Sequence, residues 1–136
     1  MKSTEKICLI DDDEIYIFLM KKSFAAMGIS NEVISFLNGA DALEEIINLK
    51  NNQGELPGII LLDINMPIMD GWEFLNEFKK LHTENQKKIP IYIVSSSISN
   101  EDIEKSKTYP EIFDYLSKPV ELETLISIVH DASLHG

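Results

Sequence analysis

Three short apolar runs limit what this chain can fold into more than any other feature of its sequence. They are rich in branched side chains and lack the polar alternation of a strand that faces water on one side: Ile7 to Ile10, Gly58 to Leu62 and Ile91 to Val94. Such runs are typical of central parallel strands that are covered on both faces. Two weaker segments, Glu32 to Phe36 and Ile112 to Ser117, complete a predicted sheet of about five strands.

The segments between these runs have the spacing of amphipathic helices. The first ends at Gly28, the second spans about Ala40 to Asn48, and a fourth begins at Ser99 with a Ser-x-x-Asp capping signal. Pro119 occupies the favoured first position of the last helix. Three helices have an apolar face that we expect to be buried: Tyr16, Leu19, Met20, Phe24 and Met27 in the first, Phe74, Leu75, Phe78 and Leu81 in the third, and Leu122, Leu125, Ile126 and Val129 in the last. This alternation of strands and helices predicts an α/β fold with right-handed crossovers.

The composition is that of one acidic globular domain. Lys and Arg number 12 and Asp and Glu 23, so the formal net charge is −11, which repels phosphate backbones and anionic membranes. The longest apolar run, Ile15 to Met20, is much shorter than the ~18 residues of a membrane span, and aspartates follow Ile10 where a secretory signal would continue. We therefore expect a single cytoplasmic domain over residues 1–136, with a core of about residues 5–133, no effector domain, and no direct contact with nucleic acid or membrane.

Polar side chains follow four of the predicted strands at the point where each strand ends. They are Asp11, Asp12 and Asp13 after the first strand, Asp63 after the third, Ser95 after the fourth and Lys118 after the fifth. In a doubly wound sheet, ligands bind beyond the carboxyl ends of the strands, so we expect these side chains to share one pocket. Asp13 is the exception, because it is well placed to cap the first helix.

Carboxylates gathered in one pocket repel one another, and a bound cation is the usual compensation. Oxygen ligands without nearby His or Cys favour Mg²⁺, which often combines one or two carboxylates with phosphate oxygens. Asp63 is suited to act as a nucleophile that forms an aspartyl phosphate, while Lys118 and the Ser95 hydroxyl neutralise and orient the phosphoryl oxygens. The residues alone therefore predict a magnesium-dependent phosphoryl site.

Together these residues resemble a response regulator receiver domain of the stand-alone kind found in chemotaxis regulators, over nearly the whole chain. The segment Leu62-Asp63-Ile64-Asn65-Met66-Pro67-Ile68-Met69-Asp70-Gly71 is its most specific part, and Lys118-Pro119 and the acidic cluster after the first strand follow in the expected order. The resemblance implies a flavodoxin-like, doubly wound parallel sheet of five strands in the order 2-1-3-4-5, with five helices.

The resemblance also implies a role for each site residue. Asp63 is the phosphoacceptor, and Asp11, Asp12, Asp63 and the backbone carbonyl of Asn65 hold Mg²⁺. Ser95 contacts the phosphoryl group, Lys118 pairs with it, and Tyr115 is an aromatic switch. Asn65 and Ser97 lie at positions that tune dephosphorylation, and the Lys118–Pro119 peptide bond is expected to be cis.

The implied function is phosphorelay signalling. A histidine kinase or histidine phosphotransfer protein passes a phosphoryl group to Asp63, and the resulting conformational shift signals to a downstream protein. In this reading the chain is not an independent enzyme, because it promotes only its own phosphorylation and dephosphorylation. The alternative is a degenerate receiver that acts as a phosphorylation-independent interaction module. The sequence leaves open whether the chain passes the phosphoryl group onward or ends the relay.

Two other classes of protein with similar patterns fit less well. A phosphatase of the haloacid dehalogenase type also uses Mg²⁺ and an acyl phosphate, but it needs a second aspartate two residues after the nucleophile, where this chain has Asn65. A flavin-binding module needs a hydroxyl- and glycine-rich loop after the first strand, where this chain has three aspartates.

Ile15 and Phe18 lie beside the buried stripe of the first predicted helix, near the pocket end, where a solvated face would carry polar groups. We hypothesise that they pack against a helical, histidine-bearing partner and bring its phosphohistidine to Asp63. The alternative is that the next loop covers both side chains.

Overall fold

The computed structural model describes residues 5–81, 88–96 and 99–135. Residues 132–135 are described by their backbone only. Strands and helices alternate along this part of the chain, as the sequence predicts. The elements are β1 (Ile7–Ile10), α1 (Glu14–Ala26), β2 (Val33–Phe36), α2 (Gly39–Asn51), β3 (Ile59–Leu62), α3 (Gly71–Leu81), β4 (Ile91–Ser95), α4 (Asn100–Ser106), β5 (Ile112–Ser117) and α5 (Leu122–His135).

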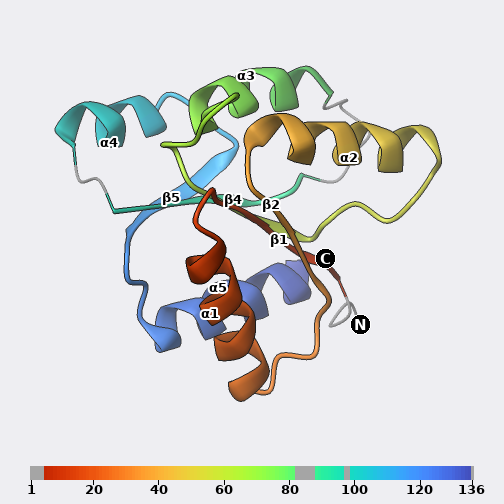
Figure 1. The fold of residues 1–136 in the computed structure, drawn as a ribbon, viewed down its shortest axis with the longest axis vertical. Coiled ribbons are helices and arrows are strands. Elements are labelled where there is room, and N and C mark those ends of the chain that lie inside the picture. Colours follow the sequence, from red (N-terminus) through yellow and green to blue (C-terminus); the bar gives the residue numbers. More distant parts are fainter. Residues whose placement is uncertain (1–4, 82–87, 97–98, 136) are drawn as a thin grey trace.

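The five strands form one parallel sheet in the order β2-β1-β3-β4-β5. Helices α2, α3 and α4 lie on one side of this sheet, and α1 and α5 lie on the other (Figure 1). The predicted doubly wound architecture and strand order are therefore confirmed. Because all five strands are parallel, their carboxyl ends lie at one edge of the sheet, and the strand order changes direction between β1 and β3, the switch point where ligands bind in such folds.

The central strands lack polar alternation because helices cover both faces of the sheet. Along β1, Cys8 and Ile10 pack in a core with α2 and α3, while Ile7 and Leu9 pack in a second core with α1 and α5. Every residue of β1, β3 and β4 is buried, whereas those of the edge strand β2 are only half-buried. Cys8 in the middle of β1 is 0% exposed.

Two of the predicted helix faces are wrong by a small rotation. In α5, Leu125 and Val129 are buried as predicted, but Leu122 and Ile126 are 54% and 44% exposed and Ile128 is buried in their place. In α1, Leu19 is 55% exposed and Ile17 is buried in its place. Both helices carry apolar side chains around most of their circumference, so two overlapping stripes satisfy the same spacing and the sheet selects one of them.

The helix starts confirm two of the predicted caps and correct a third position. Asp13 Oδ1 accepts the backbone N–H groups of Ile15 and Tyr16 at 3.0 and 3.1 Å, and Ser99 Oγ accepts that of Asp102 at 3.3 Å. The Lys118–Pro119 bond is cis, as expected. Pro119 is not the first residue of α5, because the helix begins at Leu122 and its first hydrogen bond runs from Leu125 N–H to Glu121 C=O.

None of the helices in the described ranges combines the length and the apolar character that crossing a membrane requires.

Candidate functional site

The strand ends place the predicted site residues by continuing the hydrogen-bond ladder one residue further. The Asp11 N–H donates to the carbonyl of Phe36 at 3.0 Å, and the Asp63 N–H donates to that of Ile10 at 2.9 Å. On the other side, the Lys118 N–H donates to the carbonyl of Ser95 at 2.9 Å. These bonds fix the backbone of Asp11, Asp63 and Lys118 against a neighbouring strand. Their side chains and that of Ser95 therefore emerge at the same edge of the sheet.

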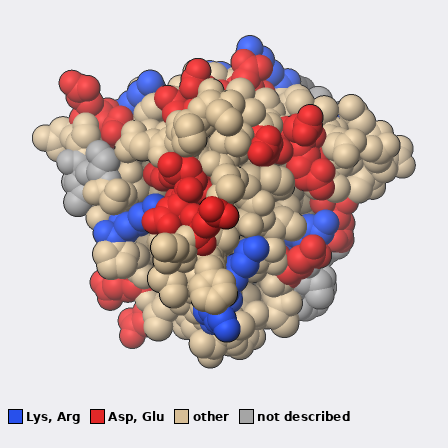
Figure 2. Space-filling model, viewed as in Figure 1, with Lys and Arg blue, Asp and Glu red and all other residues tan. Residues whose placement is uncertain are grey.

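The acidic triad, Asp11, Asp12 and Asp63, is the centre of this edge. Carboxylate oxygens from the three residues all lie within 4.8 Å of one another. Asp11 and Asp63 are 3% and 7% exposed, while Asp12 is open to solvent. Figure 2 shows acidic side chains gathered over the start of α1, where β1 ends. Three oxygen donors without a nitrogen or sulfur ligand are the donor chemistry that Mg²⁺ prefers, so the triad fits this ion.

Lys118 supplies the positive charge of the site. Its Nζ lies 2.6 Å from Asp11 Oδ2 and 3.8 Å from Asp63 Oδ2, and its side chain is only 16% exposed. Three carboxylates and one ammonium group leave two negative charges in a largely buried place. A divalent cation would balance the remainder.

Asp63 carries the clearest electrostatic signature of the site. Burial, reinforced by the negative charge of Asp11, raises the pKa of its carboxyl group from 3.8 to about 6. The ammonium group of Lys118 and the Asn65 N–H, which donates to Asp63 Oδ1 at 3.4 Å, act in the opposite direction. Asp63 is therefore ionised at neutral pH, the form that a nucleophile needs. Its carboxylate nevertheless takes up a proton at a higher pH than that of an exposed aspartate.

Asn65 follows Asp63 by two residues, in the loop after β3. Its described contact with Asp63 is made through its backbone N–H. The metal-binding role of its carbonyl stays a prediction.

Tyr16 is a site residue that the sequence reasoning assigned only to the buried face of α1. The Nζ of Lys118 lies 4.1 Å from the centre of its ring, a cation–π contact that helps to hold the lysine over the triad. Burial, followed by the charges of Asp11 and Asp63, raises the pKa of Tyr16 to about 12, so the phenol stays neutral. The contact joins residues more than a hundred positions apart in the chain, and no local sequence signal indicates it.

Ser95 and Tyr115 meet on the β4 and β5 side of the site. Ser95 is the last residue of β4 and is 0% exposed. Tyr115 lies opposite Ile93 in the parallel ladder, and burial raises the pKa of its phenol while a side-chain hydrogen bond with Ser95 lowers it. Ser97, which the resemblance implied in dephosphorylation, lies outside the described residues.

Ile15 and Phe18 lie on the outer side of α1 and are 72% and 58% exposed. Within the described residues no loop covers them, and the Lys22 amine lies 5.4 Å from the centre of the Phe18 ring. Leu19 adds a third exposed apolar side chain to the same helix. The docking role of Ile15 and Phe18 stays a prediction.

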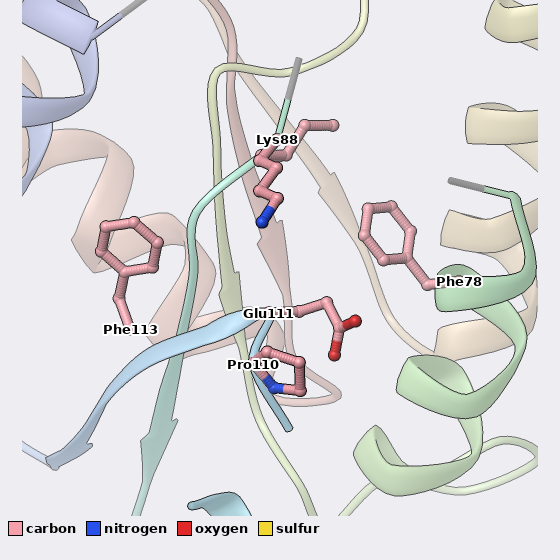
Figure 3. Close-up of a pocket in the computed structure, with 6 residues that line it drawn as sticks. Phe78, Lys88, Pro110, Glu111 and Phe113 are labelled. Atoms are coloured by element: carbon pink, nitrogen blue, oxygen red, sulfur yellow. The ribbon is translucent and has the colours of Figure 1, made fainter. Parts of the chain in front are cut away.

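A cavity of about 140 Å³ lies away from this edge, beside the residues that precede β4 and β5 (Figure 3). The Glu111 carboxylate points toward Phe78 in this view, and Lys88 and Phe113 also line the space. Among the described residues, Glu111 Oε1 is buried without a hydrogen-bond partner. Because Pro110 and Glu111 precede β5, whereas Lys118 follows it, this cavity is at the opposite edge of the sheet from the triad.

Comparison with known proteins identifies the family. Residues 7–130 match the family model of the response regulator receiver domain. The chain is 29% identical over 129 residues to the DNA-binding transcriptional regulator NtrC of Escherichia coli (strain K12), a match that covers 95% of this chain and 25% of NtrC. The chain thus spans about a quarter of the length of that relative.

Solved structures agree in fold over almost the full chain. The two component response regulator from Cytophaga hutchinsonii superposes with a TM-score of 0.84 at 29% identity and covers 96% of this chain and 97% of its own. The Mn²⁺-bound form of response regulator Rcp1 superposes with a TM-score of 0.71 at 26% identity and covers 93% of this chain and 90% of its own. Since the matched residues 7–130 include the whole site from Asp11 to Lys118, the chain belongs to the response regulator receiver domain family.

Proposed function

We propose that Asp63 is the phosphoacceptor of this receiver and that the chain signals through the conformational shift that follows its phosphorylation. The family places the chain in phosphorelay signal transduction. The observation that carries the assignment to Asp63 is its setting: a 7% exposed carboxylate with a raised pKa, 3.8 Å from the Lys118 amine and in one acidic triad with Asp11 and Asp12.

The transfer step follows from this geometry. An Asp63 carboxylate oxygen attacks the phosphorus of a partner's phosphohistidine, an O–P bond forms, and the P–N bond breaks. The electron pair of that bond stays on the imidazole nitrogen, and with the other ring nitrogen protonated the leaving group is the neutral imidazole of the partner. Lys118 is close enough to Asp63 to move onto a phosphoryl oxygen, and Ser95 offers a hydroxyl at the adjacent strand end.

Mg²⁺ is the cofactor of this proposal. Asp11, Asp12 and Asp63 would hold it, together with the backbone carbonyl of Asn65. When bound, the ion supplies positive charge that offsets the charge brought in by the phosphoryl group. The oxygen-only donor set and the two uncompensated negative charges of the site support a hard divalent cation such as Mg²⁺ over a softer metal that prefers nitrogen or sulfur ligands.

Tyr115 connects the acceptor site to the surface. Its side chain forms a hydrogen bond with Ser95. A phosphoryl oxygen on Asp63 would accept a hydrogen bond from the same serine hydroxyl. Occupation of Ser95 by the phosphoryl group changes the partner available to Tyr115, and the tyrosine shifts with it. This movement biases the face formed by α4, β5 and α5, where a downstream protein would bind.

The protein donor is a histidine kinase or a histidine phosphotransfer protein. Ile15 and Phe18 would pack against a helical part of that donor, because both side chains are apolar, exposed and one helical turn apart, at the start of the helix that follows Asp11 and Asp12. In this proposal the chain works in the cytoplasm, acts on no separate substrate, and promotes only its own phosphorylation and dephosphorylation. A phosphorylation-independent module is not favoured, since every implied site residue is retained.

Intact-mass measurement after incubation with acetyl phosphate and Mg²⁺ tests the proposal. Wild type should gain the mass of one phosphoryl group, and Asp63→Asn should gain none. Asp13→Asn is the matched control, because asparagine can still cap α1 and the residue is not part of the triad. An unphosphorylated wild type would favour the degenerate module, and a phosphorylated Asp63→Asn variant would move the acceptor to another residue.

A further inference from the structure

Ile68 has a backbone conformation that its side chain disfavours. Its φ is +70°, in the left-handed region, where a β-branched residue is a true outlier. The Met69 N–H donates to the Pro67 carbonyl at 2.7 Å and closes a three-residue turn around it. A turn of this kind with a positive φ at its centre is rare and strained, and glycine or asparagine would occupy it more easily.

The surrounding loop imposes this conformation. At one end, the Gly71 N–H donates to the Ile64 carbonyl at 2.8 Å, so closely that a Cβ at Gly71 would lie 2.7 Å from the Asp63 carbonyl oxygen. In the middle, the Gly39 N–H donates to the Met69 carbonyl at 3.1 Å and ties the loop to the start of α2. Strained residues persist where their neighbours fix them in this way.

The side chain of Ile68 is largely open to solvent within the described chain, so burial does little to stabilise it. It is 80% exposed, the highest value among the exposed large apolar residues of the described ranges. Its loop neighbours Met66 and Met69, in contrast, pack against the core on the α2 and α3 side of the sheet. The position therefore keeps an exposed, branched apolar side chain where a polar or absent one would relieve the backbone.

We infer that Ile68 is a specificity contact for the protein that donates the phosphoryl group. This inference rests on the proposed function. Asp63 is 7% exposed, so a donor that brings a phosphohistidine to bonding distance must cover the loops around it. Ile68 lies on the loop that starts at Asp63 and returns to it through Gly71, which makes the donor the partner that must meet this side chain. The contact buries the isoleucine in an apolar part of the donor surface.

The test compares two donors on three chains: wild type, Ile68→Asn and Ile68→Leu. Asparagine tolerates a positive φ but removes the apolar group, whereas leucine keeps it. Acetyl phosphate is the small donor. The protein donor is the phosphorylated histidine kinase or phosphotransfer protein with the highest kcat/KM for wild type in a panel from the source organism. We expect Ile68→Asn to unfold at the same or a higher temperature than wild type and to react equally well with acetyl phosphate.

With the protein donor, kcat/KM of Ile68→Asn should fall by about tenfold, chiefly through KM, and Ile68→Leu should stay within about threefold of wild type. Equal transfer to Ile68→Asn and wild type overturns the inference. Equal losses with both donors also overturn it, because Ile68 would then shape the acceptor site rather than touch the donor. A wild type that accepts from acetyl phosphate but from no protein of the panel overturns it as well. If wild type accepts from neither donor, the proposed function itself fails.

Discussion

The Lys118 ammonium group lies 1.2 Å nearer to Asp11 than to Asp63, at 2.6 Å against 3.8 Å. The lysine is therefore chiefly the partner of Asp11. It remains within reach of Asp63, and its contact with the Tyr16 ring limits where its amine can go. A phosphoryl group on Asp63 would offer Lys118 a second anionic partner on the acceptor side.

Removing Lys118 should destabilise the protein when no metal is bound. In Lys118→Met, Asp11 keeps its buried charge without the ion pair, and we expect the free energy of unfolding to fall by roughly 2 kcal/mol. Urea unfolding in EDTA measures the change, and Mg²⁺ should reduce the deficit by taking over part of the lysine's charge.

The matched control is Lys107→Met, which removes an exposed ion pair with Glu104 at 2.9 Å. Such pairs contribute about 0 to 1 kcal/mol, so this variant should stay near wild type. If both variants lost the same free energy of unfolding, the buried ion pair of Lys118 would contribute no more to stability than an exposed one.

The raised pKa of Asp63 should make stability depend on pH in the metal-free protein. Between about pH 4 and pH 6 the folded chain keeps a proton on Asp63 that the unfolded chain releases, so the free energy of unfolding falls as pH rises through this window. Asp63→Asn has no such charge and should be more stable than wild type by roughly 1 to 3 kcal/mol near neutral pH.

Urea unfolding of both proteins in EDTA across this range checks the sign. The two curves should converge below about pH 4, where Asp63 is protonated in the folded and the unfolded states alike. Mg²⁺ should raise the stability of wild type at neutral pH more than that of Asp63→Asn. Wild type that is as stable as Asp63→Asn at neutral pH would contradict the electrostatic account of the site.

The sequence predicts the strands and the site well because both depend on local, directional signals. An apolar run without alternation leaves little choice but a covered strand, and the residue after each run must then emerge at a common edge, as Asp63 and Lys118 do. The helix faces are predicted less well, since Leu122 and Leu125 fit a buried stripe equally and only the sheet decides between them.

Two features could not be derived from residue types at all. Tyr16 belongs to the site because Lys118, more than a hundred positions later, lies over its ring, and such a contact has no local signature. Ile68 has a positive φ although its side chain argues against one, so propensity predicts the opposite of what the loop imposes.

Gly71 should tolerate no side chain. A Cβ there would lie 2.7 Å from the Asp63 carbonyl oxygen and 2.8 Å from the Ile64 Cα, and both are backbone atoms that cannot move aside. We expect Gly71→Ala to lower the free energy of unfolding by about 2 kcal/mol and to slow phosphorylation by acetyl phosphate, because the loop that carries Asp63 must shift.

Gly54→Ala is the control for this substitution. Its Cβ would lie 2.9 Å from Leu49 Cδ2, the end of a flexible side chain, and at ordinary contact distances of 3.5 and 3.6 Å from two backbone atoms of Leu49, so urea unfolding should change little. If Gly71→Ala were as stable and as rapidly phosphorylated as Gly54→Ala, close packing of the loop against Asp63 would not matter for the site.

Glu111 offers a substitution that should stabilise the fold without touching the acceptor site. Its Oε1 is buried beside Phe78 with no hydrogen-bond partner among the described residues, and a buried acceptor left unpaired costs about 1 to 3 kcal/mol (Figure 3). Methionine has a similar length and no such requirement, so Glu111→Met should raise the free energy of unfolding by roughly 1 kcal/mol.

The control is Glu44→Met, at an exposed position on α2, which should change the free energy of unfolding by less than about 0.5 kcal/mol. Phosphorylation by acetyl phosphate should be unchanged in both variants, because the cavity and the triad lie at opposite edges of the sheet. A Glu111→Met protein that is less stable than wild type would show that the carboxylate has a partner in solution, and the Lys88 amine, which also lines the cavity, is the candidate to test.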